Sequence, residues 1–330
     1  MLWIELIKYY MMKDAILDFP KQFNYQPKLE NIEREIQAKS YLVCGMGGSH
    51  LSADLLKRIK PDLKLSIHSN YGLPKNLNYD DTLVIFSSYS GNTEEVLDGF
   101  NLARKHNYQT AVISVGGKLL ELARENNIPY IQLPDTGIQP RSALGFSLLA
   151  LMKIMNLDEF ISKLSALSQK LDPKSLANEA VGFVEKLKNK VPVIYSSELN
   201  KAIAYNWKIK MNETGKIPAF YNIFPELNHN EMTGFDVVKA SEKLSEIFTF
   251  IFLNDSGDHP KVNKRIKITK ELYEDRGLKT EMVDLKGDNV FEKIFNSLIL
   301  ADWIAVKLAE SYNLESEQVP MVEEFKNKIK

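Results

Sequence analysis

From residue 40 onward, short apolar runs alternate with longer stretches that carry apolar residues at helical spacing. Runs such as 82–86 are continuous and rich in β-branched residues, which is typical of strands buried on both faces of a parallel sheet. Stretches such as 93–106 begin with acids and place apolar residues on one face, which predicts amphipathic helices. The alternation predicts an α/β fold with mostly parallel sheets. The predicted strands are 41–44, 63–68, 82–86, 110–114, 130–133, 191–195, 247–253 and 279–284, and further helices are predicted at 198–211, 261–276 and 291–312.

The elements fall into two similar sets, which predicts two three-layer α/β/α domains with a helical connection and helical ends. The predicted boundaries are 1–37 for an N-terminal helical segment, 38–157 for the first domain, 158–190 for the connection, 191–312 for the second domain and 313–330 for a C-terminal helix. Residues 1–12 are rich in large apolar side chains, but Glu5 and Lys8 interrupt them. We therefore expect an amphipathic helix that packs on the protein, not a signal peptide or a membrane span.

Composition narrows the class of protein. The chain has 330 residues, of which 44% are hydrophobic and 26% are charged, as expected for a soluble globular protein with two buried cores. A formal net charge of -1 gives no reason to expect nucleic acid or an anionic membrane as a partner. The single cysteine, Cys44, excludes a disulfide framework and a thiolate metal cluster. We expect a cytoplasmic protein in which Cys44 is a small buried residue.

Hydroxyl side chains are concentrated at 87–93, between the apolar run 82–86 and the next predicted helix. Backbone N–H groups at the start of a helix point toward one place and favour an anion, and Ser or Thr hydroxyls add directional donors. From these residues alone, the alternative is an ordinary serine-rich turn.

A glycine-rich loop, residues 45–49, follows the first predicted strand and precedes a helix predicted to begin near His50. It is not a dinucleotide-binding motif, because His50 takes the place of the last glycine and no acid ends the second strand. It also lacks the lysine of a nucleotide-binding P-loop. A ligand could approach its backbone closely, with Ser49 as a donor. Loops at the carboxyl ends of neighbouring parallel strands can face one crevice, so we expect the two loops to share a ligand.

Residues 45–49 and 88–93 together resemble the loops of the sugar isomerase (SIS) domain, whose members bind phosphosugars through them. Three later segments, 137–143, 212–220 and 225–231, are similar in order and spacing to the bifunctional phosphoglucose/phosphomannose isomerase family. The resemblance covers nearly the whole chain. It implies two SIS-type domains and an isomerase that interconverts glucose 6-phosphate, and also mannose 6-phosphate, with fructose 6-phosphate through a cis-enediol. It implies no cofactor and no metal.

The resemblance also implies roles for particular residues. Glu213 matches the base that moves the proton, and the apolar neighbours Ile217, Pro218 and Phe220 are expected to raise its pKa. His229 matches the residue that opens the sugar ring, which suits a group that titrates near neutrality. The residues implied in phosphate binding are Gly47, Gly48, Ser49, Ser88, Ser90 and Thr93.

Two further cations match family positions. Arg141 is implied to stabilise negative charge on the enediolate. Lys326 stands where the family's closing helix has a lysine near the sugar ring, although a solvated lysine-rich tail is the alternative. Val319 replaces the threonine that usually precedes the proline of that segment. This departure bears on the choice between glucose and mannose 6-phosphates.

By the same resemblance we expect a homodimer with shared active sites, in which His229 serves the neighbouring subunit. No two histidines have the spacing of metal ligands, in keeping with a metal-independent reaction. Two alternatives remain open. One is another SIS-domain enzyme, such as a heptose or aminosugar phosphate isomerase. The other is a phosphosugar-binding regulator without catalytic activity, although no basic recognition helix is evident before the first strand.

Overall fold

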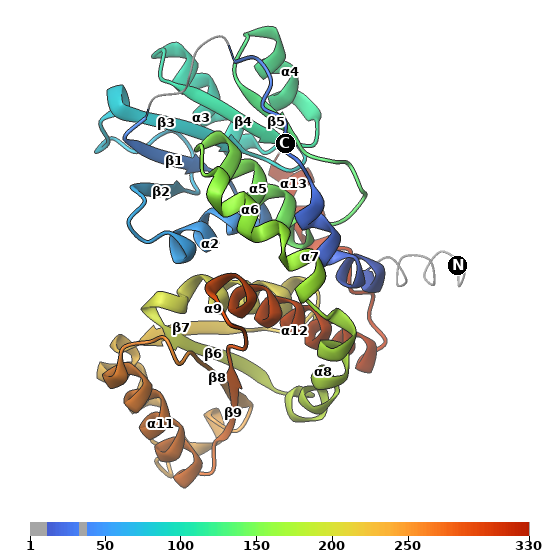
Figure 1. Ribbon diagram of the computed structural model, residues 1–330. Coiled ribbons are helices and arrows are strands. Elements are labelled where there is room, and N and C mark those ends of the chain that lie inside the picture. Colours follow the sequence, from blue (N-terminus) through green and yellow to red (C-terminus); the bar gives the residue numbers. More distant parts are fainter. Residues whose placement is uncertain (1–11, 33–37, 330) are drawn as a thin grey trace. The chain divides into compact units, whose positions relative to one another are not determined.

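The computed structural model describes residues 12–32 and 38–329, whose elements are drawn in Figure 1. The chain divides into two compact units. Within the described ranges, the first unit is Asp18–Lys170, and the second unit combines Leu171–Lys330 with the N-terminal residues up to Leu17. This division falls inside the predicted helical connection 158–190. The domain boundaries expected from the sequence stay predictions.

The first unit contains a five-stranded sheet in the order β2-β1-β3-β4-β5, and all neighbouring strands pair in parallel. Phe86 and other residues that point to one face form an apolar core with α3 and α4, while α2 and α5 cover the opposite face (Figure 1). The result is a three-layer α/β/α unit. Its elements are β1 (Ser40–Cys44), α2 (Leu51–Ile59), β2 (Leu65–His68), β3 (Thr82–Ser87), α3 (Glu94–Lys105), β4 (Thr110–Ser114), α4 (Gly117–Glu125), β5 (Tyr130–Gln132), α5 (Leu144–Ile154), α6 (Asp158–Ser165) and α7 (Leu167–Lys170).

The second unit contains a four-stranded parallel sheet in the order β7-β6-β8-β9. Tyr195, Phe250 and Phe252 on one face of this sheet pack against Ile266 and Tyr273 of α11. Helices α9 and α12 lie on the other face (Figure 1). The elements are α8 (Pro173–Leu187), β6 (Val191–Ser197), α9 (Lys201–Glu213), β7 (Phe220–Phe224), α10 (Glu231–Gly234), β8 (Phe248–Asn254), α11 (Pro260–Asp275), β9 (Lys279–Asp284), α12 (Val290–Ser311) and α13 (Pro320–Ile329).

Helix α12 is buried on most of its surface because it contacts both α8 and α9. A helix that is buried on most sides is apolar around most of its circumference, and its buried polar residues need hydrogen-bond or ion-pair partners. Asp302 of α12 pairs with Lys210 of α9 at 2.6 Å, and Ser297 accepts a hydrogen bond from Trp207 Nε1 at 2.9 Å. These buried polar contacts fix α9 against α12.

The expected α/β fold with mostly parallel sheets is confirmed, and each of the predicted strands overlaps an observed strand. The sequence interpretation missed β7. This strand lies at the edge of the second sheet, where only its last residue, Phe224, is buried, and Asn222 interrupts its apolar pattern. A half-exposed edge strand lacks the continuous apolar run that marks a buried parallel strand.

The N-terminal prediction falls largely on residues 1–11, which lie outside the described residues. Residues 12–17 are helical, and Met12 and Ile16 are buried in the second unit. Cys44 is a free, buried thiol, as predicted, and burial raises its pKa to about 12.

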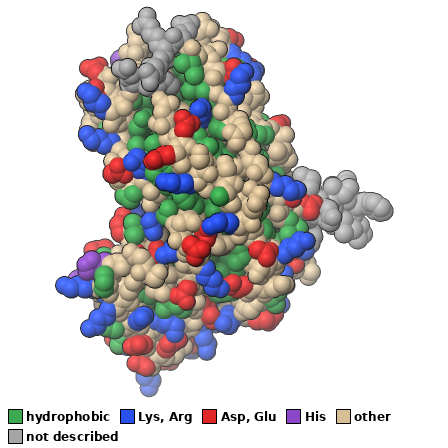
Figure 2. All heavy atoms as spheres, in the orientation of Figure 1, with side chains coloured by type: hydrophobic (Ala, Val, Ile, Leu, Met, Phe, Trp, Pro, Cys, Tyr) green, Lys and Arg blue, Asp and Glu red, His purple; other side chains and the backbone are tan. Residues whose placement is uncertain are grey.

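The surface carries a mixture of charges. Figure 2 shows acidic and basic side chains interspersed over the face that it draws, in keeping with the formal net charge of -1. Across residues 12–32 and 38–329, no helix combines the length and the apolar character that crossing a membrane requires.

Candidate active site

The two loops predicted to bind phosphate emerge at the same edge of the first sheet. They follow β1 and β3, which are neighbours in that sheet, and the first ends in the short 3-10 helix η2 (Gly47–Ser49). The backbone N–H of Tyr89 donates to Ser49 Oγ at 3.0 Å, and Ser87 Oγ donates to the Ser49 carbonyl oxygen at 2.7 Å. The structure therefore brings the two loops into direct contact.

Within the second loop, Ser88 organises the backbone. Its buried Oγ accepts a hydrogen bond from the Gly91 N–H at 3.1 Å and lies 2.9 Å from Thr93 Oγ1. Ser90 is exposed, and Thr93 is the half-buried N-cap residue of α3. A hydroxyl that accepts one hydrogen bond still has its own O–H to donate. Ser88, Ser90 and Thr93 thus lie in one short loop at a helix N-terminus, the arrangement that favours an anion.

Two glycines are required by close packing around these loops. Gly91 has φ +71°, and a Cβ added to it would lie 1.8 Å from the Gly116 carbonyl oxygen. A Cβ on Gly48 would lie 2.8 Å from the backbone nitrogen of Arg141. Arg141 belongs to the 3-10 helix η4 (Pro140–Ser142) and is only 1% exposed. The structure therefore places the Arg141 backbone against the Gly47–Ser49 turn.

We expect Gly48→Ala to raise the KM for a sugar phosphate about tenfold, because the turn must shift away from Arg141 and its donors are misplaced. Steady-state kinetics with the folded variant measures this effect. Gly182→Ala is the matched control, since Gly182 is exposed in α8 with open space around it, and alanine there favours the helix. An unchanged KM for Gly48→Ala would contradict the prediction that this turn binds the phosphate.

Glu213 is the last residue of α9 and is half-buried. Lys216, with φ +58°, folds back so that its Nζ donates to the Glu213 carbonyl oxygen at 2.6 Å and also to the Gln318 carbonyl oxygen. The predicted apolar enclosure of Glu213 is only partly present. Ile217 is half-buried, but Pro218 is exposed and Phe220 is 55% exposed because it begins the edge strand β7.

His229 ends the 3-10 helix η6 (Glu226–His229) and is exposed. Its neighbours in the chain are held from inside the unit: Asn228 Nδ2 donates to Thr269 Oγ1 at 2.8 Å, and Tyr195 OH donates to Glu231 Oε1 at 2.5 Å. The sequence interpretation assigned no role to these neighbours. The sequence could have indicated a polar partner for Tyr195, because this tyrosine lies in the apolar run 191–195 and a buried tyrosine hydroxyl needs a hydrogen-bond partner.

Lys326 lies on α13, where the described residues are exposed. Its Nζ forms an ion pair with Glu323 Oε1 of the same helix at 2.7 Å. Hydrogen bonds between and within the two loops bring Ser49, Ser88 and Thr93 together, and the close approach of Gly48 to the Arg141 backbone adds the Arg141 segment. Glu213, His229 and Lys326 belong to three separate elements of the second unit.

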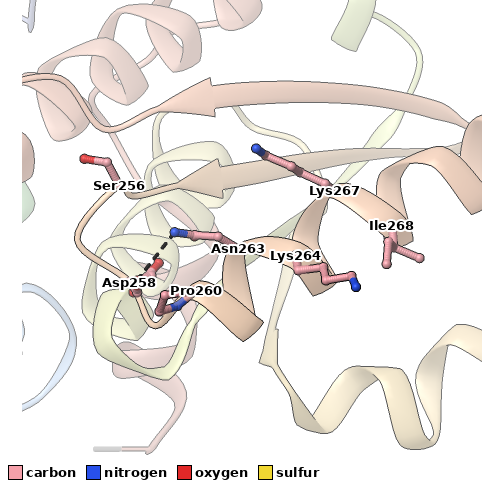
Figure 3. A pocket seen from close by; sticks show the side chains of 7 residues that line it. All are labelled: Ser256, Asp258, Pro260, Asn263, Lys264, Lys267 and Ile268. Atoms are coloured by element: carbon pink, nitrogen blue, oxygen red, sulfur yellow. Dashed lines mark hydrogen bonds between the residues drawn. The ribbon is translucent and has the colours of Figure 1, made fainter.

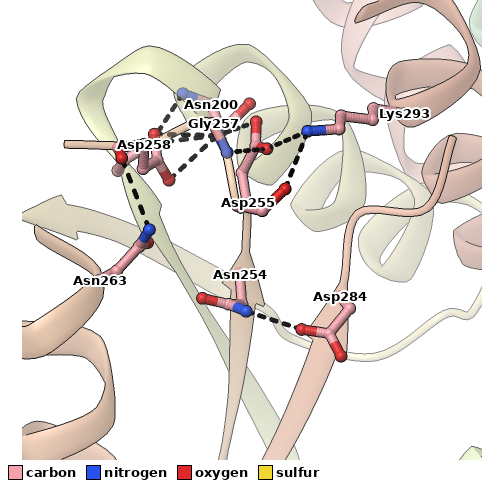
Figure 4. Close-up of polar contacts among 10 residues, drawn as sticks. Asn200, Asn254, Asp255, Gly257, Asp258, Asn263, Asp284 and Lys293 are labelled. Carbon is pink, nitrogen blue, oxygen red and sulfur yellow. Dashed lines mark hydrogen bonds and ion pairs between the residues drawn. The ribbon is translucent and has the colours of Figure 1, made fainter. Parts of the chain in front are cut away.

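The carboxyl edge of the second sheet is chemically different from that of the first. Figure 4 shows Asn200, Asp255, Asp258 and Lys293 joined there by hydrogen bonds and an ion pair. Burial alone would raise the pKa of Asp255, but hydrogen bonds from Lys293, the Gly257 N–H and Asn200 lower it below its usual value. Buried carboxylates that already accept the hydrogen bonds of the nearby donors make this edge unsuitable for a phosphate, which is itself an anion that needs donors. The first unit is therefore the better candidate for anion binding.

A pocket of about 510 Å³ lies at the start of α11, where Figure 3 shows its lining side chains. Lys264, Lys267 and Asp258 give it mixed charge, and none of the predicted site residues lines it. Among the described residues, no group of three or more His, Cys, Asp or Glu side chains could hold a metal ion.

Comparison with known proteins defines the class. Residues 176–329 match the family model described as the bacterial phospho-glucose isomerase C-terminal SIS domain. The C-terminal domain of glucosamine-fructose-6-phosphate aminotransferase from Francisella tularensis has the same fold, with a TM-score of 0.67 at 15% identity over 95% of this chain and 97% of that chain. The fold, the paired loops and the family match together define a SIS-domain protein.

Curated relatives specify the family. The bifunctional phosphoglucose/phosphomannose isomerase of Aquifex aeolicus is 32% identical over 93% of this chain and 96% of the relative. The protein of the same name from Caldicellulosiruptor bescii is 30% identical over 96% of this chain and 98% of the relative. The chain belongs to the bifunctional phosphoglucose/phosphomannose isomerase family.

Proposed function

We propose that the chain interconverts glucose 6-phosphate and mannose 6-phosphate with fructose 6-phosphate. The observation that carries this proposal is the direct hydrogen bonding between the glycine-rich loop and the hydroxyl-rich loop at the edge of the first sheet. Such a site suits the phosphate group that all three sugars share. Family membership selects the reaction from those that act on phosphosugars.

In this proposal the loops anchor the phosphate. The O–H groups of Ser49 and Ser90 donate to its oxygens, Ser88 and Thr93 do so when the hydrogen bond between them opens, and the Gly47–Gly48 backbone lets the anion approach closely. Charge-assisted hydrogen bonds of this kind are stronger than neutral ones, and the N-terminus of α3 adds a favourable electrostatic contribution.

The proton transfer is assigned to Glu213. Its carboxylate takes the C2 proton of the open-chain aldose, and the electron pair of that C–H bond forms the C1–C2 double bond of a cis-enediol. The proton of the O2 hydroxyl passes to O1, and Glu213 returns its proton to C1 to complete the ketose. Arg141 stabilises the negative charge that develops on the oxygens, and its buried guanidinium remains charged throughout.

Ring opening is assigned to His229, which exchanges a proton with the ring oxygen. We further propose a homodimer in which His229 completes the site of the neighbouring subunit. An exposed imidazole on a segment that is held from inside its own unit supports this assignment. Lys326 is proposed to assist near the sugar ring, and the single buried thiol supports a cytoplasmic location.

The direct test uses purified full-length protein with fructose 6-phosphate and excess EDTA. We expect glucose 6-phosphate and mannose 6-phosphate to accumulate, because the proposed chemistry needs only side chains of this protein. Separate enzymatic assays for the two products measure the activities. No conversion in the presence or absence of the chelator would overturn the proposal, whereas conversion only without it would replace the metal-independent mechanism. Glucosamine 6-phosphate and a heptose phosphate test the alternative SIS chemistries.

A further inference from the structure

The segment that carries His229 is tied to the second unit on both sides of this residue. On one side, Asn228 Nδ2 donates to Thr269 Oγ1 at 2.8 Å, and Asn228 Oδ1 accepts from Arg265 at 3.3 Å. Both of these partners belong to α11. The N-terminal side of the histidine is therefore fastened to a long helix rather than to another loop.

On the other side, Glu231 accepts hydrogen bonds from two strands. Tyr195 OH of β6 donates to Oε1 at 2.5 Å, and Asn222 Nδ2 of β7 donates to Oε2. Each carboxylate oxygen thus has one donor. Because a carboxylate with a partner on each oxygen is held in position and orientation, Glu231 fixes the start of α10 to the sheet.

The Tyr195 hydroxyl is not needed for packing. Its ring is fully buried among aromatic side chains, including Phe224, Phe250 and Phe252. Phenylalanine would fill this space without a polar atom, and a buried hydroxyl lowers stability unless it is hydrogen-bonded. Burial also raises the pKa of Tyr195, so its hydroxyl remains a donor. The hydroxyl therefore acts on Glu231.

We propose that Tyr195 and Glu231 are positioning residues that hold His229 in the orientation needed for ring opening, an inference that rests on the proposed function. Neither touches the substrate in this proposal. Their contribution comes from restricting the His229 segment, since a catalytic group displaced by a fraction of an ångström loses much of its effect.

The test compares Tyr195→Phe with Tyr273→Phe. Both changes remove one hydroxyl from the same aromatic core, and the two oxygens lie 3.3 Å apart, but only Tyr195 bonds Glu231. We expect Tyr195→Phe to lower kcat for glucose 6-phosphate about tenfold with little change in KM, and Tyr273→Phe to change kcat less than about twofold. Equal effects of the two variants would overturn the inference. Glu231→Gln serves as the second variant if Tyr195→Phe does not fold.

Combination with His229→Ala separates positioning from a general loss of structure. We expect Tyr195→Phe to have no further effect on kcat in the His229→Ala background, because it acts through the histidine that is already missing. Independent, multiplying effects would overturn the inference. The His229 imidazole signal in NMR spectra gives a readout without turnover: it should shift in Tyr195→Phe and not in Tyr273→Phe. An unmoved signal overturns positioning, whereas a wild-type protein that does not isomerise overturns the proposed function.

Discussion

Replacing Glu213 by glutamine is expected to lower kcat about 1000-fold, because the amide keeps the shape of the side chain but cannot accept the C2 proton. The KM should change little, since the proposed function assigns the phosphate to the loops of the first unit, whereas Glu213 lies on α9 of the second unit. Steady-state kinetics with glucose 6-phosphate and fructose 6-phosphate measures both parameters. Exchange of the C2 proton with deuterated solvent should be lost in parallel with turnover.

Glu242→Gln is the matched control for Glu213→Gln. Glu242 is an exposed acid of the same unit, in the 3-10 helix η7 (Glu242–Leu244), so the same chemical change there should leave kcat unaltered. Near-normal turnover of Glu213→Gln would exclude Glu213 as the base. A similar loss in both variants would instead indicate an effect of net charge on the unit.

Asp302→Ala is expected to lower the free energy of unfolding of the second unit by about 3–5 kcal/mol. The Lys210–Asp302 pair is almost fully buried, with side chains 2% and 5% exposed, so removing the carboxylate leaves an ammonium group without a counter-charge between α9 and α12. Denaturant unfolding followed by the fluorescence of Trp207 and Trp303 measures the change in this unit, because these two residues lie on α9 and α12.

Two comparisons define this effect. Glu179→Ala breaks the exposed Lys286–Glu179 pair in the same unit and should cost less than about 1 kcal/mol. The double variant Lys210→Met/Asp302→Leu should recover most of the stability, since an apolar pair of similar volume can replace a buried ion pair. A loss below about 1 kcal/mol for Asp302→Ala would mean that water or a rearranged side chain compensates Lys210.

The sequence predicted the first unit's loops well because their geometry follows from topology. Buried parallel strands are recognised in a sequence as continuous apolar runs, and parallel strands present their carboxyl ends at one edge of the sheet. The proximity of residues 45–49 and 88–93 could therefore be predicted from the sequence, and the pairing of β1 with β3 confirms it. The close packing that requires glycine at positions 48 and 91 could not be predicted, because the neighbours that exclude a Cβ, Arg141 and Gly116, are remote in sequence or reached through a turn.

Other features depended on tertiary context. Lys210 and Asp302 each read as an ordinary charged residue on a helix, and only the packing of α9 on α12 buries them together. Phe220 read as part of an apolar wall, yet the strand it begins lies at an edge and leaves it exposed. The network around Glu231 joins residues from three elements, of which β7 was not predicted at all.

The cluster formed by Asn200, Asp255, Asp258 and Lys293 distinguishes two sheets that otherwise follow the same winding. At the carboxyl edge of the first sheet, the loops offer hydroxyl and N–H groups to a ligand. At the carboxyl edge of the second sheet, the chain itself supplies both the carboxylates and the ammonium group that pairs with them. The two units therefore share an architecture but differ in the groups that they offer to a ligand at this edge. In the proposed function, the phosphate binds at the edge of the first sheet, and the second unit supplies Glu213 and His229.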